Sequence, residues 1–202
     1  MHRTICDYVL DLVENSVEAG SSVISVSLSE TESLLRLRVE DNGKGMSDEE
    51  TALAIDPFYS DFQKKHPERK VGLGLSFAAQ TASEIGGEFS IDSQVSVGTL
   101  LELSFPLDNI DCPPTGELPS TLAALFGFGG SYELRLHRVR KGREYTISRS
   151  DFVRVLGSID DVGARGLIQE YLASCEDELQ RGENDGQDEF GRVTETAAEQ
   201  TT

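Results

Sequence analysis

The stretch Asp41-Asn42-Gly43-Lys44-Gly45-Met46 decides the fold of this chain of 202 residues. It follows a run, 34–39, in which apolar residues alternate with polar ones, as in a strand with one buried face. That strand delivers Asp41 to its end, and Asn-Gly is a strong turn signal. Two glycines two residues apart also let a ligand approach the backbone closely, where side chains would block it. The segment is therefore either an ordinary turn or a ligand-binding loop that opens with an acid.

An amphipathic helix precedes this loop. Its apolar residues recur at helical spacing from Cys6 to Val17, and Ala19-Gly20 ends it with a glycine cap. Asp11 and Asn15 lie four residues apart, so both project from one face of the helix. An acid and an amide suit a hydrated Mg²⁺, which prefers oxygen ligands and keeps several waters. On these residues alone, the alternative is that this face is simply solvated.

A second glycine-rich segment opens a later helix. Val71-Gly72-Leu73-Gly74-Leu75-Ser76 leads into a run of small and apolar residues, 77–82. A glycine loop that opens a helix presents free N–H groups and the positive end of the helix dipole, which suits a triphosphate. The polar and charged run 60–69 before it is typical of a lid that orders over a ligand. The sequence also predicts a helix over 48–55 capped by Ser47 and Glu50, and strands over 23–28, 88–93 and 100–105.

Taken in this order, the segments resemble the Bergerat-type ATP site of the GHKL superfamily, which includes gyrase, the Hsp90 chaperone, histidine kinases and MutL. The matching segments span about residues 5–107. The resemblance implies an α+β fold, a two-layer α/β sandwich of the histidine-kinase-like ATPase type with a mixed sheet covered by helices. The wording of residues 12–16 looks most like MutL, whereas Asp56-Pro57-Phe58-Tyr59-Ser60, Gly72-Leu73-Gly74-Leu75 and Gly98-Thr99 look more like histidine kinases.

The same resemblance implies ATP and Mg²⁺ as cofactors and suggests a role for several residues. Asn15 matches an asparagine that coordinates Mg²⁺ and bridges it to the phosphates, and Asp41 matches an aspartate that accepts a hydrogen bond from the adenine amino group. Asp11 falls where gyrase and MutL carry a glutamate that activates water, but an aspartate reaches less far. Thr99 matches a threonine that lies near the phosphates in the kinases. The other implied nucleotide-binding residues are Gly43, Gly45, Met46, Phe58, Gly72, Leu73, Gly74 and Leu75.

Changes in composition suggest four parts. Residues 1–110 are expected to form the ATP-binding domain, and 111–117, with two prolines, to form a linker. Residues 118–180 are predicted to form a small α+β appendage containing a β-hairpin, which we expect to dock on the ATPase domain or on a partner because its core is small. Residues 181–202 are acidic with few apolar side chains and are expected to be a disordered tail.

The overall charge limits the class of partner. The chain has 36 acidic and 18 basic residues, a formal net charge of −18, which argues against nucleic acid because phosphate binding needs a basic surface. Three widely separated cysteines have no metal-binding spacing, and reduced thiols in the cytoplasm are the simplest interpretation. Neither a signal peptide nor a long apolar run is present, so we expect a cytoplasmic protein without a membrane anchor.

A histidine kinase carries its phosphoacceptor histidine in a helical hairpin ahead of the ATP domain. Only about ten residues precede Asp11, too few for such a hairpin at 1.5 Å rise per residue. The three histidines, His2, His66 and His137, lack kinase-like surroundings. We therefore expect an ATP-binding regulator like the stand-alone anti-sigma-factor kinases, which phosphorylates a partner protein or binds it in a nucleotide-dependent way. Two alternatives stay open: a nucleotide-gated binding module without turnover, and an ATPase clamp of the MutL or chaperone kind that forms a homodimer with ATP.

Overall fold

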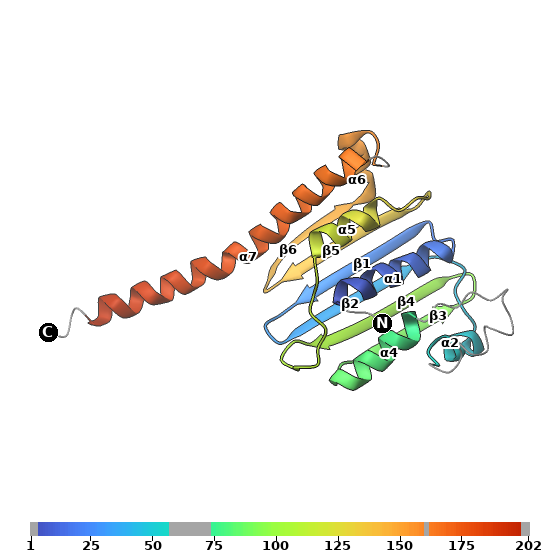
Figure 1. Cartoon of the computed structure of the whole chain (residues 1–202), viewed down its shortest axis with the longest axis horizontal. Helices are drawn as coiled ribbons and strands as arrows, with labels where there is room; N and C mark the ends of the chain where they lie inside the picture. The colour runs from blue at the N-terminus through green and yellow to red at the C-terminus, as the bar shows by residue number, and fades with distance from the viewer. Residues whose placement is uncertain (1–3, 57–73, 160–161, 199–202) are drawn as a thin grey trace.

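The computed structural model describes residues 4–56, 74–159 and 162–198, with side chains described up to Arg181. It contains a six-stranded sheet in the order β3-β4-β2-β1-β5-β6. Neighbouring strands are antiparallel except β1 and β5, which are parallel, so the sheet is mixed. Figure 1 shows α1, α4 and α5 lying over one face of this sheet. The predicted two-layer architecture is confirmed.

The elements are as follows. The strands are β1 (Val23–Glu30), β2 (Leu34–Asp41), β3 (Phe89–Gln94), β4 (Gly98–Pro106), β5 (Glu133–Arg140) and β6 (Arg143–Ser148). The helices are α1 (Ile5–Glu18), α2 (Asp48–Ala54), α4 (Gly74–Ile85), α5 (Leu118–Phe126), α6 (Arg149–Leu156) and α7 (Val162–Ala198).

Local sequence explains where the first helices begin. The Ser47 hydroxyl accepts a hydrogen bond from the Glu50 N–H, and the Glu50 carboxylate accepts one from the Ser47 N–H at 3.0 Å. This is the capping box predicted for α2. Thr4 and Asp7 form the same reciprocal pair at the start of α1. Both boxes satisfy N–H groups that a helix leaves without an acceptor in its first turn.

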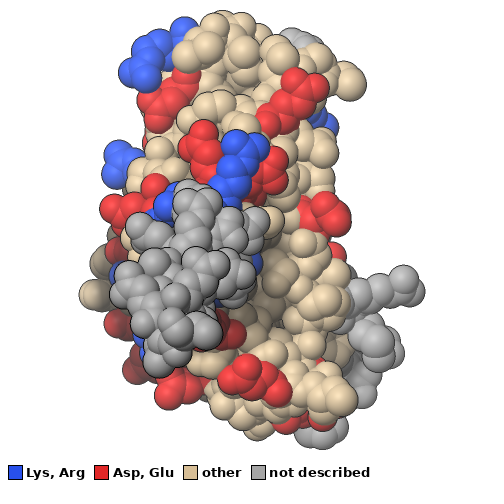
Figure 2. All heavy atoms as spheres, turned by 90° about the vertical axis from the view of Figure 1, so that its left-hand side faces the viewer, with Lys and Arg blue, Asp and Glu red and all other residues tan. Residues whose placement is uncertain are grey.

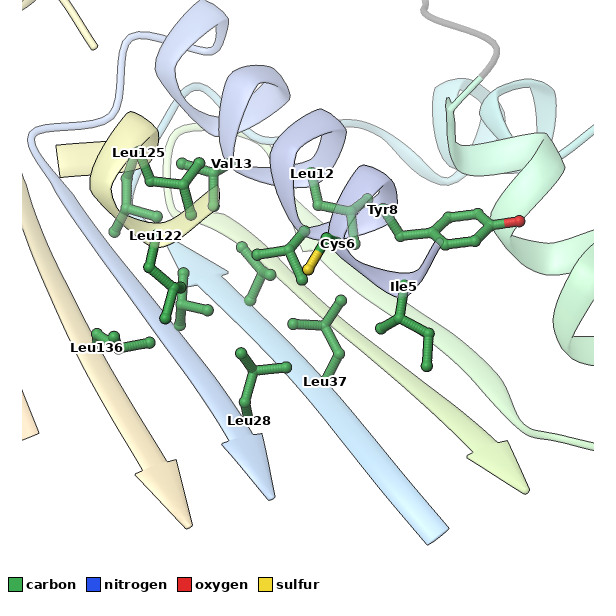
Figure 3. Close-up of a cluster of buried hydrophobic side chains, with 14 of the residues drawn as sticks. Ile5, Cys6, Tyr8, Leu12, Val13, Leu28, Leu37, Leu122, Leu125 and Leu136 are labelled. Carbon is green, nitrogen blue, oxygen red and sulfur yellow. The ribbon is translucent and has the colours of Figure 1, made fainter. Parts of the chain in front are cut away.

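The core lies between the sheet and the helices. Apolar side chains on the helix-covered face of the strands form rows across the sheet, such as Val39, Leu101 and Ile91 on β2, β4 and β3. Figure 3 shows side chains of α1 and α5 meeting those of the strands in one cluster. Burial of these side chains stabilises the fold at about 25 cal/mol per Å² of apolar surface. The apolar alternation in the sequence therefore reports the face that the helices cover.

Residues beyond 110 extend the same sheet. β5 pairs in parallel with β1 along its whole length, from Val23 opposite Glu133 to Glu30 opposite Arg140, and the buried core is continuous from α1 to α5 and α7. The expected linker 111–117 lies along the start of α1, where the Pro114 carbonyl accepts from the Ile5 N–H at 2.9 Å. The sheet is thus continuous across the domain boundary that the sequence suggests. β5 joins the open edge of β1 and so gives hydrogen-bond partners to the backbone N–H and C=O groups of that edge. No local sequence pattern shows which strand takes this place.

The last helix is longer than the sequence suggests. α7 runs to Ala198, through most of the segment 181–202 that was expected to be a disordered tail. Figure 1 shows the end of α7 extending away from the sheet. Among the described residues, no helix is long and apolar enough to cross a membrane.

Acidic residues outnumber basic ones in the chain, 36 to 18. Figure 2 shows Asp and Glu side chains scattered over the face at the left of Figure 1, with a smaller number of Lys and Arg side chains among them. The two signs of charge are interspersed in this view.

A buried ionic cluster joins α7 to the sheet. The Arg138 side chain on β5 is 1% exposed and lies between Glu30 of β1 and Glu176 of α7. Its Nε donates to Glu176 Oε1 at 3.2 Å, and its guanidinium also contacts the Glu30 carboxylate. The Tyr145 hydroxyl donates to Glu176 Oε1 at 2.9 Å, and burial, followed by the Glu176 charge, raises the pKa of Tyr145. The cluster therefore fixes α7 to the sheet at Glu176 by directional contacts.

Replacing Arg138 by methionine should strongly destabilise the protein. The substitution leaves the buried Glu176 without this cation and, among the described ion pairs, leaves the partly buried Glu30 with only Arg140. Removing one partner of a buried ion pair costs about 3–5 kcal/mol. The matched control is Arg38→Met, because the Arg38 side chain is 43% exposed and its ion pairs are at the surface. That change should cost less than about 1 kcal/mol. Urea unfolding measures both, and equal losses would contradict the structural role assigned to Arg138.

Candidate functional site

The apolar rows of the sheet end in a polar row. Asp41, Thr99 and Ser93 are successive cross-strand partners on β2, β4 and β3, on the face that the helices cover. The hydroxyl oxygens of Ser93 and Thr99 lie 2.8 Å apart. A carboxylate and two hydroxyls thus lie together at one end of the core. Polar groups at this position can bind a polar edge of a ligand whose flat faces are apolar.

The Asp41 carboxylate is held by three donors. Its Oδ2 accepts from the Ser16 hydroxyl of α1 at 2.8 Å. Its Oδ1 accepts from the Ser21 hydroxyl at 3.0 Å and from the Gly43 N–H at 2.8 Å. A carboxylate has about four acceptor positions. Oδ2, with one protein donor, therefore keeps a direction for a donor on a ligand, and Asp41 is only half-buried.

Sequence reasoning missed Ser16 and Ser21. Ser16 lies on the buried face of α1, 4% exposed, and its hydroxyl is also 3.2 Å from the Leu12 carbonyl oxygen. The shorter contact, to the Asp41 carboxylate, is the stronger because its acceptor is charged. The available signal was a serine at a position where helical spacing calls for an apolar residue. A buried hydroxyl requires a partner, and Asp41 is that partner.

The glycines of the loop are required by the protein's own packing. A Cβ on Gly45, whose φ is +61°, would lie 1.9 Å from the Gln94 carbonyl oxygen. A Cβ on Gly98, with φ of +139°, would lie 1.9 Å from the Asp41 carbonyl oxygen, and one on Gly43 would lie 2.6 Å from the Ser21 hydroxyl. The sequence suggested that Gly43 and Gly45 admit a ligand. The structure shows neighbouring protein atoms where their side chains would be. The approach of a ligand to this loop stays a prediction.

Met46 connects the loop to the polar row. Its N–H donates to the Ser93 hydroxyl at 2.9 Å, and its side chain packs partly buried against the core. Thr99 was matched to a threonine near the phosphates, whereas strand register puts it directly beside Asp41. Thr99 and Met46 therefore border the same end of the site as the carboxylate.

The polar face of α1 meets the beginning of α4. A Cβ on Gly74, the first residue of α4, would lie 3.3 Å from Asp11 Oδ2 and 3.8 Å from Asn15 Nδ2. The structure thus brings Asp11 and Asn15 together beside a helix N-terminus, whose N–H groups and dipole favour an anion. Leu75, the next residue, is buried at 8% exposure. Of the other predicted residues, Phe58, Gly72 and Leu73 lie outside the described residues, as does the lid segment 60–69.

A metal ion would not find a complete set of protein ligands here. Among the side chains that the structure describes, no group of three or more His, Cys, Asp or Glu residues can hold a metal ion. A cation bound by the Asn15 amide oxygen or the Asp11 carboxylate would take its remaining ligands from water or from a bound phosphate. That arrangement is typical of Mg²⁺ and not of a structural metal.

Family comparison agrees with this geometry. The family model of the histidine kinase-, DNA gyrase B- and HSP90-like ATPases matches residues 3–109, which is more than half of the chain. The chain belongs to this ATPase family. It therefore contains an ATP-binding domain of the GHKL type, as the order of its motifs predicted.

Similar proteins relate this ATPase domain to histidine kinases. The signal transduction histidine-protein kinase AfsQ2 of Streptomyces coelicolor is 30% identical over 107 residues, which cover 53% of this chain and 20% of that kinase. Sporulation kinase C of Bacillus subtilis is 30% identical over 100 residues, 48% of this chain and 22% of the kinase. The chain thus spans about a fifth of the length of these relatives.

Two solved structures show distant similarity. The catalytic domain of histidine kinase ThkA gives a TM-score of 0.37 at 20% identity, covering 50% of this chain and 63% of that one. The Aquifex aeolicus MutL ATPase domain complexed with ADP gives 0.37 at 17% identity, covering 73% of this chain and 64% of that one.

Two effects would destabilise an alanine at position 45: a steric clash with the Gln94 carbonyl oxygen and a left-handed backbone conformation. A second glycine allows the two effects to be measured separately. Gly45 and Gly86 have similar φ angles, +61° and +73°, but a Cβ on Gly86 would meet no atom within 4 Å. Gly86→Ala should therefore lower the free energy of unfolding by about 1–2 kcal/mol, the cost of a left-handed alanine. Gly45→Ala should cost more, because the backbone at Gln94 must also move. Equal costs in denaturant unfolding would show that the loop does not need this contact.

Proposed function

We propose that this protein binds Mg-ATP between the polar row of Asp41, Thr99 and Ser93 and the N-terminus of α4. We propose further that it transfers the γ-phosphoryl group of ATP to a partner protein. One observation carries the proposal: α1 supplies residues to both ends of the site. Ser16 bonds to Asp41, while its neighbour Asn15, together with Asp11, faces Gly74. A base-binding end and a phosphate-binding end would thus be held within about one and a half turns of the same rigid helix.

Asp41 would recognise the base. The exocyclic amino group of adenine is a donor, and the free direction on Asp41 Oδ2 is an acceptor. Thr99 and Ser93 add hydroxyls beside it, 2.8 Å apart, which can bond to the base directly or through water. Met46 offers an apolar and polarizable surface for a flat ring. The match of donor to acceptor favours adenine over a base that presents a carbonyl oxygen at that position.

The other end suits phosphate. The N–H groups of the first turn of α4 would donate to phosphate oxygens, and the Asn15 amide oxygen would be a ligand of Mg²⁺. When bound, Mg²⁺ would neutralise part of the negative charge of the phosphates. Asp11, beside the same helix end, would orient the acceptor group of the partner and take its proton as the phosphoryl group is transferred.

Substituting Asp41 by asparagine should weaken ATP binding about ten-fold or more, because a hydrogen bond to a charged acceptor contributes roughly 1.5–3 kcal/mol. The asparagine amide also replaces one acceptor oxygen by an NH₂ donor. That donor would face the three protein donors to Asp41 and the adenine amino group. Asp92→Asn is the matched control: it removes the same charge from β3, next to Ser93, but from an exposed position. Calorimetric titration with Mg-ATP measures both. Equal affinity in Asp41→Asn and wild type, with circular dichroism unchanged, would remove the adenine role.

Phosphotransfer should depend on Asp11. Asp11→Ala is expected to retain ATP affinity within a few-fold while transfer from labelled ATP to a copurifying protein falls by about 10²–10⁴, the range for a lost general base. Glu14→Ala provides the control, since Glu14 is exposed on the same helix. An unchanged rate in Asp11→Ala would count against this role.

Binding without turnover is the second candidate. The short reach of Asp11, one methylene less than a glutamate, favours it. Wild-type protein that binds ATP tightly but transfers no label to any copurifying protein would support this candidate over the first. Steady hydrolysis together with ATP-dependent dimerisation would instead support the clamp alternative.

The thiols support a reducing compartment. Cys6, Cys112 and Cys175 are all free, and burial raises the pKa of each thiol. Free thiols are ordinary in the cytoplasm, where ATP is also available. The proposal therefore places the protein and its phosphoacceptor there.

A further inference from the structure

α1 and α4 are antiparallel neighbours. Asp11 and Asn15, in the middle and the last part of α1, lie beside Gly74 at the start of α4. Tyr8, near the start of α1, meets Thr81 in the second half of α4. The buried contacts of α4 include small residues, among them Ala78 and Ala82. Small apolar side chains let two helices approach closely but do little to fix their position along the shared axis.

The Tyr8–Thr81 pair provides a directional contact. The two hydroxyl oxygens lie 2.6 Å apart. Figure 3 shows the Tyr8 hydroxyl pointing away from the apolar cluster, toward α4. Tyr8 is 2% exposed, and its ring packs against Phe105 with ring centres 5.8 Å apart. Burial raises the pKa of Tyr8.

We propose that Tyr8 and Thr81 are positioning residues that fix α4 along its axis and thereby fix its first N–H groups relative to Asn15 and Asp11. The inference rests on the proposed function for its consequence in catalysis. A helix rises 1.5 Å per residue, so a slide smaller than one residue would misplace the phosphate-binding groups. Misplacement of about 1 Å can reduce a reaction rate about 10²-fold.

Two substitutions remove the contact with little change in shape. Tyr8→Phe keeps the ring on Phe105, and Thr81→Val keeps the branched side chain. Each should weaken ATP binding about three- to ten-fold and leave adenosine binding unchanged, since adenosine uses only the Asp41 end. The double variant should lose less than the sum of the two single losses, because both single substitutions remove the Tyr8–Thr81 contact. Additive losses, or equal losses for ATP and adenosine, would overturn the proposal.

Tyr132→Phe is the matched control. Tyr132 is also buried, at 6% exposure, and its hydroxyl donates to the Leu125 carbonyl oxygen at 2.9 Å, away from α4. It should lower stability but leave the ratio of ATP to adenosine affinity unchanged. A shift of that ratio in Tyr132→Phe as large as in Tyr8→Phe would show a merely structural effect.

A measurement without nucleotide separates this inference from the proposed function. Amide hydrogen exchange of residues 78–82 should be several-fold faster in Tyr8→Phe than in wild type, and unchanged in Tyr132→Phe. Unchanged exchange in Tyr8→Phe would overturn the positioning role whether or not ATP binds. Failure of wild type to bind ATP, with faster exchange in Tyr8→Phe, would refute only the proposed function.

Discussion

The carboxylate of Asp41 is the interaction on which the candidate site depends. Its protein donors come from a helix, from the connection after that helix and from the loop that follows its own strand. One acidic side chain thus fixes α1, the start of β1 and the glycine loop relative to one another. A group with this many fixed donors is pre-organised, because little rearrangement is needed before it accepts one more donor.

The second constraint is the placement of α1 between two neighbours. One side of this helix bonds to the sheet at Asp41, and the adjacent side meets α4 at Asp11 and Asn15. On the proposed function, the distance between a bound base and its phosphates would therefore be set largely by one rigid element and not by loops. Rigid elements hold binding groups more accurately than loops do, which suits a site that must align a phosphoryl group for transfer.

The parts of the structure governed by local patterns were predictable. The alternation of apolar and polar residues predicted β2, and the Ser47–Glu50 capping box predicted the start of α2. The order of the glycine motifs predicted the family. Contacts between distant segments were not. Nothing local pairs β5 with β1, directs Arg138 into the core between two glutamates, or joins Ser16 to Asp41. These depend on long-range burial and hydrogen bonding, in which a strand or polar side chain takes whichever partner the assembled fold offers.

The central claim is that one site has a base end at Asp41 and a phosphate end at α4. Amide chemical shifts recorded in separate titrations with adenosine and with inorganic tripolyphosphate plus Mg²⁺ test it most directly. The account predicts that adenosine shifts the signals of Gly43 and Thr99, and that tripolyphosphate shifts those of Gly74 and Leu75. Adenosine acting on the α4 amides, or neither ligand moving either pair, would contradict it.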